Sequence, residues 1–374
     1  MSLRPSAPAG LVLAVASLTV SASPAAGQAA PAGVQRRDGA ASAAPTKLWS
    51  APRMPWGHPD ISGVWTSDGV IGIPLQRPDR FAGRAELTDE EFADKVKHDA
   101  ETKERAENAV GSFRNDNAWL VKSFKQTSLI VDGDGKLPPL TPAAELRRAT
   151  RDRGSFGEGP FGSPEDFTNY DRCITRGIVG SVLPVVYGNG NRILQTPKEV
   201  VISYEMVHDT RVIPLDGRPH IAGSIRQYLG DSRGHWEGET LVVETSNLTD
   251  RTSIGLNGNG LRHSAAMKIV ERFTRVAADE LKYEISIDDP KTYTRPFTIS
   301  VPLISPGGFQ LLPYDCHEGN YMLANVLSGE RAEDRAIEED ANKGIVRARR
   351  PVQFNERAPA GTVASENGPP LPER

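Results

Sequence analysis

Five polar segments between residues 170 and 318 contain the side chains that could do chemistry. Histidine is the side chain best suited to proton transfer near neutral pH, and a carboxylate can orient it. His208 directly precedes Asp209, and His317 directly precedes Glu318. Because neighbours in a strand point to opposite faces, each histidine would need a partner from another segment. The candidate catalytic residues are His317, Glu318, His208, Asp209, Asp171 and Tyr170.

Arginine and aromatic side chains in the same segments could hold a substrate. A guanidinium group can bind an anionic or carbonyl oxygen, and the flat face of an indole can pack on a sugar or an aromatic ring. The candidate substrate-binding residues are Arg172, Arg211, Arg233, His235 and Trp236. Structural alternatives stay open, because the charges at 170–172 could form a salt-bridged collar and Trp236 could belong to the core.

Cys173 and Cys316 are the only cysteines of the chain. An even number in an exported protein predicts a disulfide. Since bonded cysteines have Cα atoms about 5.5 Å apart, this bond would bring His317 and Glu318 to the 170–172 segment. The bond would also stabilise the fold by roughly 4–5 kcal/mol in the chain-entropy model. The alternative is a cysteine nucleophile, although a thiolate in an oxidising compartment tends to be oxidised.

Histidines and carboxylates could also bind a metal. Zinc needs three or four ligands at tetrahedral spacing, and the chain has neither H-E-x-x-H nor C-x-x-C. The sequence therefore assigns no metal site and no cofactor, while a metal remains an alternative. The histidines that could contribute are His208, His220, His235, His263 and His317, with Asp209 or Glu318 as oxygen donors.

The ends of the chain differ from its middle. Arg4, an apolar run at 10–22 and the small residues at 25–27 are typical of a cleavable signal peptide over 1–27. The run is too short for a membrane span of about 20 residues, so we expect a periplasmic or secreted protein without an integral membrane segment. Residues 28–50 and 351–374 are predicted to be a disordered linker and tail. A single β-rich domain is expected over 51–350.

Short apolar runs separated by glycine and proline dominate this domain and predict strands joined by turns. Helices are expected at 87–110, where Thr88 and Glu91 form a capping box, at 142–150 and at 330–343. The fold class expected is mainly β, a lipocalin-like antiparallel barrel or sandwich with a few peripheral helices. Candidate strands lie at 127–131, 182–187, 192–196, 199–206, 210–214, 224–229, 240–246, 267–276, 280–288, 297–303 and 309–314.

Two parts of the sequence resemble known proteins. Residues 60–65, DISGVW, resemble the opening strand of lipocalin-like barrels, in which Gly-x-Trp closes the bottom of the barrel. Over 50–335 the chain resembles a group of exported bacterial proteins of no established activity. The resemblance therefore implies export and a β-rich, lipocalin-like fold, but no reaction. Its segments are YDRCITRG (170–177), YEMVHDTRVIPLDGRPH (204–220), GDSRGHWEGETLVVET (230–245), DDPKTYTRP (288–296) and CHEGN (316–320).

Two functions are compatible with these features. The first is an exported hydrolase, lyase or isomerase that uses histidine and carboxylates on a small organic or sugar-like substrate. The second is a non-catalytic, lipocalin-like protein that binds a small molecule or glycan. The net charge of −4 gives no sign of a nucleic-acid surface. A pocket lined by His208, His235 and His317 would favour the enzyme, whereas dispersal of these residues over the surface would favour the binding protein.

Overall fold

The computed structural model describes residues 49–108, 122–151, 160–185, 187–255 and 260–349. The predicted signal peptide, nearly all of the predicted linker and the predicted tail lie outside these residues. None of the helices in the described ranges is both long and apolar enough to cross a bilayer.

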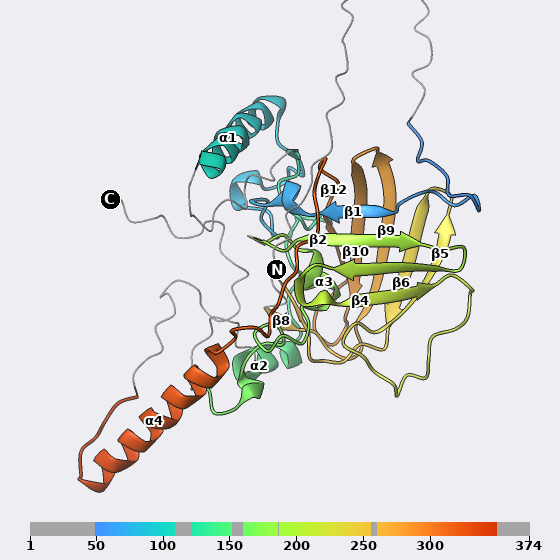
Figure 1. Ribbon diagram of the computed structural model, residues 1–374. Coiled ribbons are helices and arrows are strands. Elements are labelled where there is room, and N and C mark those ends of the chain that lie inside the picture. The colour runs from blue at the N-terminus through green and yellow to red at the C-terminus, as the bar shows by residue number, and fades with distance from the viewer. Residues whose placement is uncertain (1–48, 109–121, 152–159, 186, 256–259, 350–374) are drawn as a thin grey trace, which may run out of the picture. The chain divides into compact units, whose positions relative to one another are not determined.

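A large antiparallel sheet forms the body of the protein (Figure 1). Its strands follow the order β4-β3-β2-β1-β12-β10-β9-β6-β5, and β11 pairs with β10 beside this path. A separate two-stranded ladder joins β7 to β8. The strands are β1 (Gly63–Thr66), β2 (Gly190–Gln195), β3 (Glu199–Tyr204), β4 (Thr210–Pro214), β5 (Asp231–Glu237), β6 (Thr240–Ser246), β7 (Ser253–Ile254), β8 (Leu261–Arg262), β9 (Lys268–Ala277), β10 (Glu280–Asp288), β11 (Phe297–Ser300) and β12 (Leu303–Ile304).

Alternation of apolar and polar residues explains which face of the sheet is buried. In β10, Leu281, Tyr283, Ile285 and Ile287 are fully buried, and the residues between them are more exposed. Successive side chains of a strand point to opposite faces, so each strand gives one face to the core. Trp65 of β1 belongs to this core, and its indole N–H donates to the carbonyl of Ile61.

The sheet folds over on itself. Strands β2, β3 and β4 run across the view of Figure 1, and the upright strands β9, β6 and β5 lie behind them. The edge strands β4 and β5 thus come side by side, although no ladder joins them among the described strands. We call this line the seam. The prediction of a mainly β, antiparallel fold is confirmed.

Gly234 explains how closely β4 and β5 approach each other at one end of the seam. A Cβ atom at this position would lie 2.8 Å from the side chain of Leu215 and 2.9 Å from that of Ile213. Glycine therefore lets β5 approach the segment around β4 here. At the other end of the seam, Arg211 and Ser232 are joined only by a long side-chain contact of 3.4 Å.

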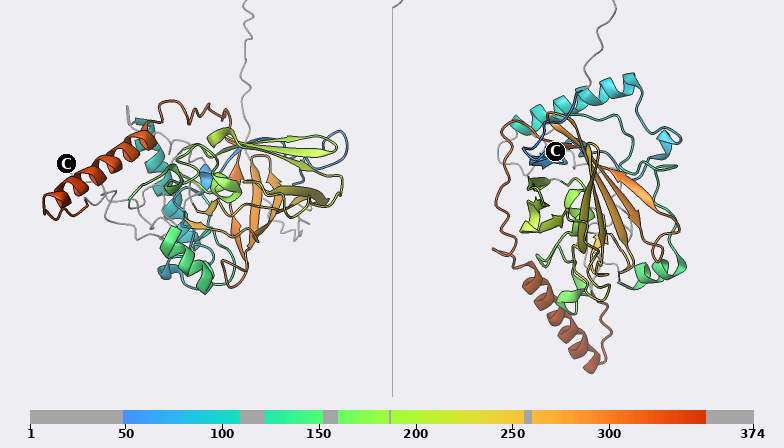
Figure 2. Two further views of the ribbon diagram at one scale, coloured as in Figure 1. Left: turned by 90° about the horizontal axis from the view of Figure 1, so that it is seen from below. Right: turned by 90° about the vertical axis from the view of Figure 1, so that its right-hand side faces the viewer.

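Helices α1, α2 and α4 lie outside the sheet (Figure 2), whereas α3 is buried against the core. The predicted capping box of α1 is present, because the Thr88 hydroxyl accepts from the Glu91 amide and the Glu91 carboxylate accepts from the Thr88 amide. The C-terminal helix starts eight residues before its predicted beginning. The α-helices are α1 (Asp89–Asn108), α2 (Pro142–Arg151), α3 (Gly177–Val182) and α4 (Met322–Asn342). Short 3₁₀ turns lie at Asp68–Val70, Asp79–Phe81, Pro164–Asp166 and Met206–His208.

Several strand predictions are wrong. The run predicted as a strand at 182–187 begins at the end of α3, a helix whose six residues are all buried. A short apolar run that is buried on all sides has no periodicity to separate helix from strand. Residues 309–314 are a loop, and the other two segments form only isolated bridges, from Gln227 to Leu248 in 224–229 and from Ile130 to Ile299 in 127–131. The glycine-rich segment at 231–237 is strand β5.

Candidate functional site

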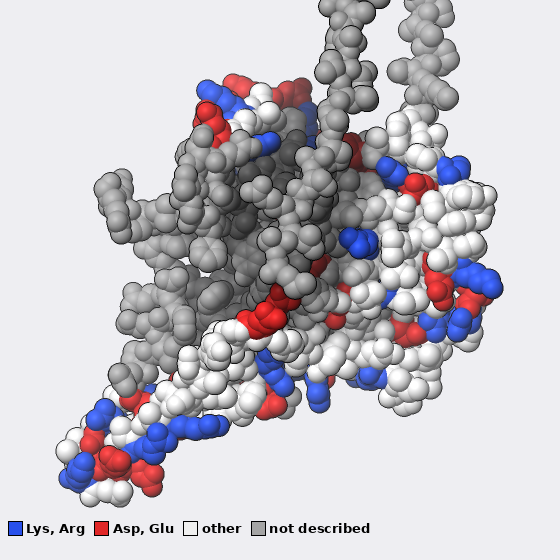
Figure 3. All heavy atoms as spheres, viewed as in Figure 1, with Lys and Arg blue, Asp and Glu red and all other residues white. Residues whose placement is uncertain are grey.

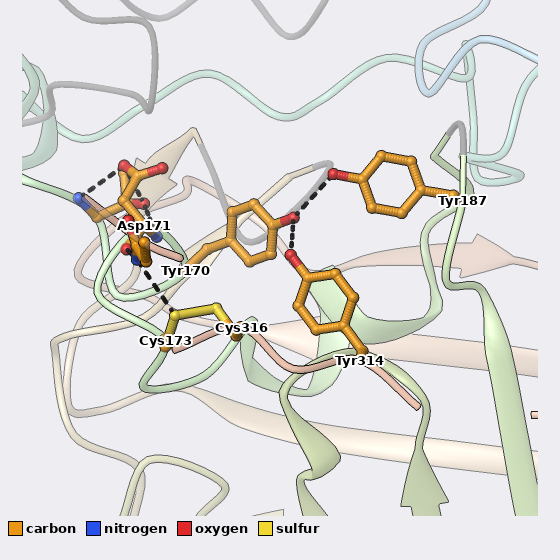
Figure 4. The surroundings of a disulfide bond; sticks show 8 residues. Tyr170, Asp171, Cys173, Tyr187, Tyr314 and Cys316 are labelled. Atoms are coloured by element: carbon orange, nitrogen blue, oxygen red, sulfur yellow. Dashed lines mark hydrogen bonds between the residues drawn. A yellow bond between two sulfur atoms is a disulfide. The ribbon is translucent and has the colours of Figure 1, made fainter. Parts of the chain in front are cut away.

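The predicted disulfide between Cys173 and Cys316 is confirmed (Figure 4). The two Cα atoms lie 5.7 Å apart. Asn320 adds to the link, because its side-chain amide donates to the carbonyl of Asp171 at 3.0 Å and lies 3.4 Å from the sulfur of Cys173. The bond therefore joins the 170–173 segment to the 314–320 loop, as the sequence predicted.

The residues predicted to converge at this disulfide do not form one site. Asp171 accepts from the Thr168 hydroxyl at 2.8 Å, which stabilises a local turn, and Arg172 pairs with Glu165 at 3.4 Å. The side chains of His317 and Glu318 are exposed. Within the described residues, neither of these two makes a side-chain hydrogen bond or ion pair. Their catalytic roles remain predictions that the geometry does not support.

Two tyrosines that the sequence did not single out, Tyr187 and Tyr314, lie beside the disulfide with Tyr170, a predicted catalytic residue. Figure 4 shows the hydroxyls of Tyr170, Tyr187 and Tyr314 pointing toward one another. The Tyr170 oxygen lies 3.1 Å from that of Tyr314 and 3.5 Å from that of Tyr187. Tyr314 is two residues from Cys316, so its place follows from the disulfide. No sequence signal marks Tyr187.

The other predicted catalytic pair is also separated. His208 is exposed, whereas the Asp209 carboxylate accepts from the Thr175 hydroxyl. Burial raises the pKa of Asp209, although the Thr175 hydrogen bond opposes the shift. His235 is exposed and lies 3.2 Å from Glu237. His208, His235 and His317 thus lie on different exposed segments rather than in one pocket.

Trp236 packs against the hydrophobic core, as in the structural alternative for this residue. Its ring centre lies 5.2 Å from that of His58.

A pocket opens in the seam where β4 and β5 separate. Its volume is about 560 Å³, within the range of roughly 300–1,000 Å³ that is usual for small-molecule sites. Arg211, predicted to bind substrate, contributes to its wall. We call this cavity the seam pocket, and its lining residues are Thr210, Arg211, Val212, Gln227, Tyr228, Leu229, Gly230, Asp231 and Ser232.

A buried ion pair lies behind the seam pocket. Two nitrogens of Arg211 on β4 donate to the two oxygens of Glu271 on β9, each at 2.7 Å, and both side chains are almost fully buried. The Tyr283 hydroxyl donates to Glu271 at 2.6 Å. Burial alone would lower the pKa of Arg211, but the charge of Glu271 raises it above its usual value. Arg211 therefore stays charged, and its two hydrogen bonds to Glu271 connect the two halves of the folded sheet.

Asp231 brings a second charge to the pocket wall. One of its oxygens accepts from Arg233 at 2.8 Å, and the other contacts the His220 Nδ1 at 2.8 Å and the Ile221 amide at 3.1 Å. Arg233, also predicted to bind substrate, is thus occupied by Asp231 and by the carbonyls of Pro219 and Ser232. Both charged residues of the pocket wall have counter-charges within the fold.

Across the described parts of the chain, no three His, Cys, Asp or Glu side chains lie close enough together to hold a metal ion. On the face seen in Figure 3, basic and acidic side chains are interspersed rather than gathered into a patch of one sign.

No known family matches this chain. Comparison with models of protein families, with curated proteins and with solved structures gives no significant match in any of the three. The resemblance to lipocalin-like exported proteins therefore remains an expectation from the sequence.

One histidine is buried and neutral. The Nδ1 of His263 donates to the Ser264 carbonyl at 3.0 Å, and the Thr252 hydroxyl donates to its Nε2 at 2.5 Å. Burial lowers the pKa of His263, despite the nearby charges of Asp289 and Asp250; Arg147 lowers it further.

This histidine predicts an acid-sensitive contribution to stability. The unfolded chain binds a proton near pH 6.5, whereas the folded state resists it. The contribution is therefore complete above pH 6.5 and is lost as the pH falls below 6.5. When the pH is lowered from 7.5 to 5.5, the free energy of unfolding should fall in both proteins. We expect the fall to be about 1 kcal/mol larger in wild type than in His263→Gln. Urea denaturation of both proteins at the two pH values measures this, and equal losses would contradict it.

Proposed function

We propose that this protein is an exported, lipocalin-like protein that binds a small organic or sugar-like ligand in the seam pocket. The observation that carries the proposal is the cavity itself, which lies where the two edges of the folded sheet separate. Barrel-like folds commonly bind ligands where their strands end or part. The dispersed positions of His208, His235 and His317 also favour binding over catalysis.

The walls of the seam pocket favour an uncharged ligand with hydroxyl groups. Arg211 is neutralised by Glu271, and Asp231 is neutralised by Arg233. A charged ligand buried there would lose its hydration without gaining a counter-charge. Thr210 and Tyr228 offer hydroxyl groups, and the Tyr228 ring offers a flat face on which a sugar could pack. A neutral mono- or disaccharide has this chemistry.

The proposal includes export to the periplasm or the outside of the cell. The disulfide supports it, since such bonds form and persist in oxidising compartments. The signal-like segment at 1–27 gives the same expectation from the sequence alone.

Blocking the seam pocket with a large side chain tests the proposal. Val212 lines the pocket and is 53% exposed, so Val212→Trp should fill the cavity with little loss of core packing. A panel of neutral mono- and disaccharides should contain one that raises the melting temperature of wild type by about 5 °C at a hundredfold excess over its dissociation constant. Val212→Trp should abolish this rise.

Val276→Trp is the matched control. Val276 lies on β9, is 41% exposed and does not line the seam pocket, so this variant should keep the full temperature rise. If both variants lose the temperature rise equally, or if Val212→Trp keeps it in full, the ligand binds elsewhere.

A second candidate function rests on the pair formed by His220 and Asp231. An ionised carboxylate accepts but does not donate, so with Asp231 ionised Nδ1 of His220 is the donor, and in the neutral ring Nε2 can accept a proton. A carboxylate that orients an imidazole in this way is typical of a general base. Because Asp231 lines the seam pocket, this pair is a candidate for acid–base catalysis on the bound ligand.

Activity assays can separate this function from simple binding. If the protein hydrolyses nitrophenyl glycosides or nitrophenyl esters, His220→Gln should lower kcat by about 100-fold or more. His235→Gln, at an exposed histidine outside the pocket lining, should keep wild-type activity. Activity that survives His220→Gln would remove this residue from the mechanism.

A further inference from the structure

Arg176 is a buried cation whose donors are only partly used. Its side chain is 1% exposed, and one of its nitrogens donates to the Gly188 carbonyl at 3.4 Å, a long contact. The Nε and Nη2 groups are buried and have no hydrogen-bond partner. Leaving buried donors of a charged group unsatisfied is costly. A buried arginine in this state needs a physical reason.

The surroundings of Arg176 do not neutralise it. Among the described residues, Arg176 forms no ion pair within 4.0 Å. The nearby Glu205 uses one oxygen to accept from the Gly190 amide and the other to accept from the Leu312 amide, both at 2.9 Å. Burial lowers the pKa of Arg176 to about 10, which is the direction expected of a cation without a full counter-charge.

The guanidinium group lies over the ring of Tyr170, whose hydroxyl contacts those of the other two tyrosines. The Arg176 Cζ is 5.9 Å from the centre of the Tyr170 ring, and Tyr170 meets Tyr187 and Tyr314 through its hydroxyl. Burial raises the pKa of both Tyr170 and Tyr314, so these phenols keep their protons at neutral pH.

The hydroxyl contacts leave donor capacity for a ligand. Three hydroxyl protons serve two contacts, so at least one proton is not used within the group. The contacts of 3.1 and 3.5 Å also exceed the usual O–H···O distance of about 2.7–2.8 Å. Such long contacts can be exchanged for stronger bonds to an incoming oxygen. Tyr187 is 44% exposed and gives access to the group from solvent.

We propose that Arg176 and the hydroxyls of Tyr170, Tyr187 and Tyr314 form a binding site for a small anion of the carboxylate or phosphate class. The phenols donate to the anion oxygens, and Arg176 supplies the positive charge beneath them. Hydrogen bonds to an ionised group are shorter and stronger than those between neutral groups. This anion site is separate from the seam pocket and does not depend on the function proposed for it.

The disulfide makes the anion site sensitive to redox state. Tyr314 is two residues from Cys316, and the bond to Cys173 fixes its loop beside Tyr170. Without the bond, the 314–320 loop has fewer constraints, and Tyr314 would no longer be held in the group. The anion site should therefore be complete only in the oxidised protein.

Titration of the purified protein with sodium phosphate and, separately, sodium acetate tests this inference. Calorimetry at constant ionic strength, with sodium chloride as the reference, should show saturable heat for at least one of the two anions. The anion that binds more tightly identifies the class of ligand. If neither phosphate nor acetate gives more binding heat than chloride, the proposal is overturned.

Tyr187→Phe is the first variant, because it removes only a hydroxyl from a partly exposed ring. We expect about tenfold weaker anion binding, the loss expected for one hydrogen bond to a charged group. Tyr321→Phe, at a residue that is 72% exposed and outside the group, should bind like wild type. Equal affinity in wild type and Tyr187→Phe would remove the tyrosine group from the site.

Two further proteins complete the test. Arg176→Lys keeps the charge but loses the fork of donors, so it should bind the anion more weakly while remaining folded, as circular dichroism can verify. Cys173→Ser combined with Cys316→Ser should also weaken binding, because Tyr314 is released. Wild-type affinity in the double serine variant would overturn the redox part of the proposal, and wild-type affinity in Arg176→Lys would overturn the role of the guanidinium fork.

Discussion

Replacing Arg211 with alanine is expected to lower the free energy of unfolding by about 3–5 kcal/mol. The change leaves the Glu271 side chain fully buried and without its cationic partner, and among the described residues only the Tyr283 hydroxyl still donates to it. It also removes the contact that connects β4 to β9 across the fold. Urea denaturation monitored by tryptophan fluorescence measures the loss.

Two controls separate the buried ion pair from its neighbours. Arg272→Ala breaks an exposed pair with Glu237, so it should cost less than about 1 kcal/mol. The double change Arg211→Met with Glu271→Leu removes both charges and should recover most of the stability lost in Arg211→Ala. A double variant as unstable as the single one would show that packing, rather than the unpaired charge, accounts for the loss.

Loss of the disulfide is expected to have a comparable effect. Cys173 and Cys316 are separated by 143 residues, and cross-links that close long loops stabilise most in the chain-entropy model. Replacing both with serine should lower the free energy of unfolding by about 2–5 kcal/mol. Chemical denaturation of the variant and of wild type gives this difference.

Reduction provides an independent check on the same bond. A thiol reductant should destabilise wild type by a similar amount and leave the double serine variant unchanged. If wild type is as stable reduced as oxidised, the bond is not a stabilising element of the fold.

Most strands were predictable because one of their faces is buried. The alternation in β10 reports a half-buried strand without knowledge of its partners, whereas Leu241, Val242 and Val243 of β6 are all buried. Helix α3 was not predictable in this way, because Gly177–Val182 is buried on every side and shows no polar face. Strand β5 was hidden by Gly234, a glycine that suggests a turn in the sequence but permits the close approach of Ile213 in the fold.

The disulfide was the most informative local signal for a site. Two cysteines can pair in one way, so their bond predicted that segments 143 residues apart would meet. It correctly placed Tyr170 beside the loop that follows Tyr314. It could not predict that His317 and Glu318 would point into solvent, because the direction of a side chain depends on the local path of its loop.

The seam pocket and its buried ion pair were beyond local sequence reasoning. Arg211 was predicted as a substrate-binding residue, but its partner Glu271 lies 60 residues away on another part of the sheet. A single glutamate in an alternating strand gives no sign of whether it faces solvent or a buried arginine. Only the folding of the sheet onto itself brings the two together.

Hydrogen–deuterium exchange, with and without the neutral disaccharide that gives the largest rise in melting temperature, locates the bound ligand on the protein. If the ligand binds in the seam pocket, peptides that cover 208–232 should gain protection when the sugar is added. Peptides that cover 170–190 and 310–320, at the disulfide, should stay unchanged. Protection confined to the disulfide region, or none near β4 and β5, would contradict binding in the seam pocket.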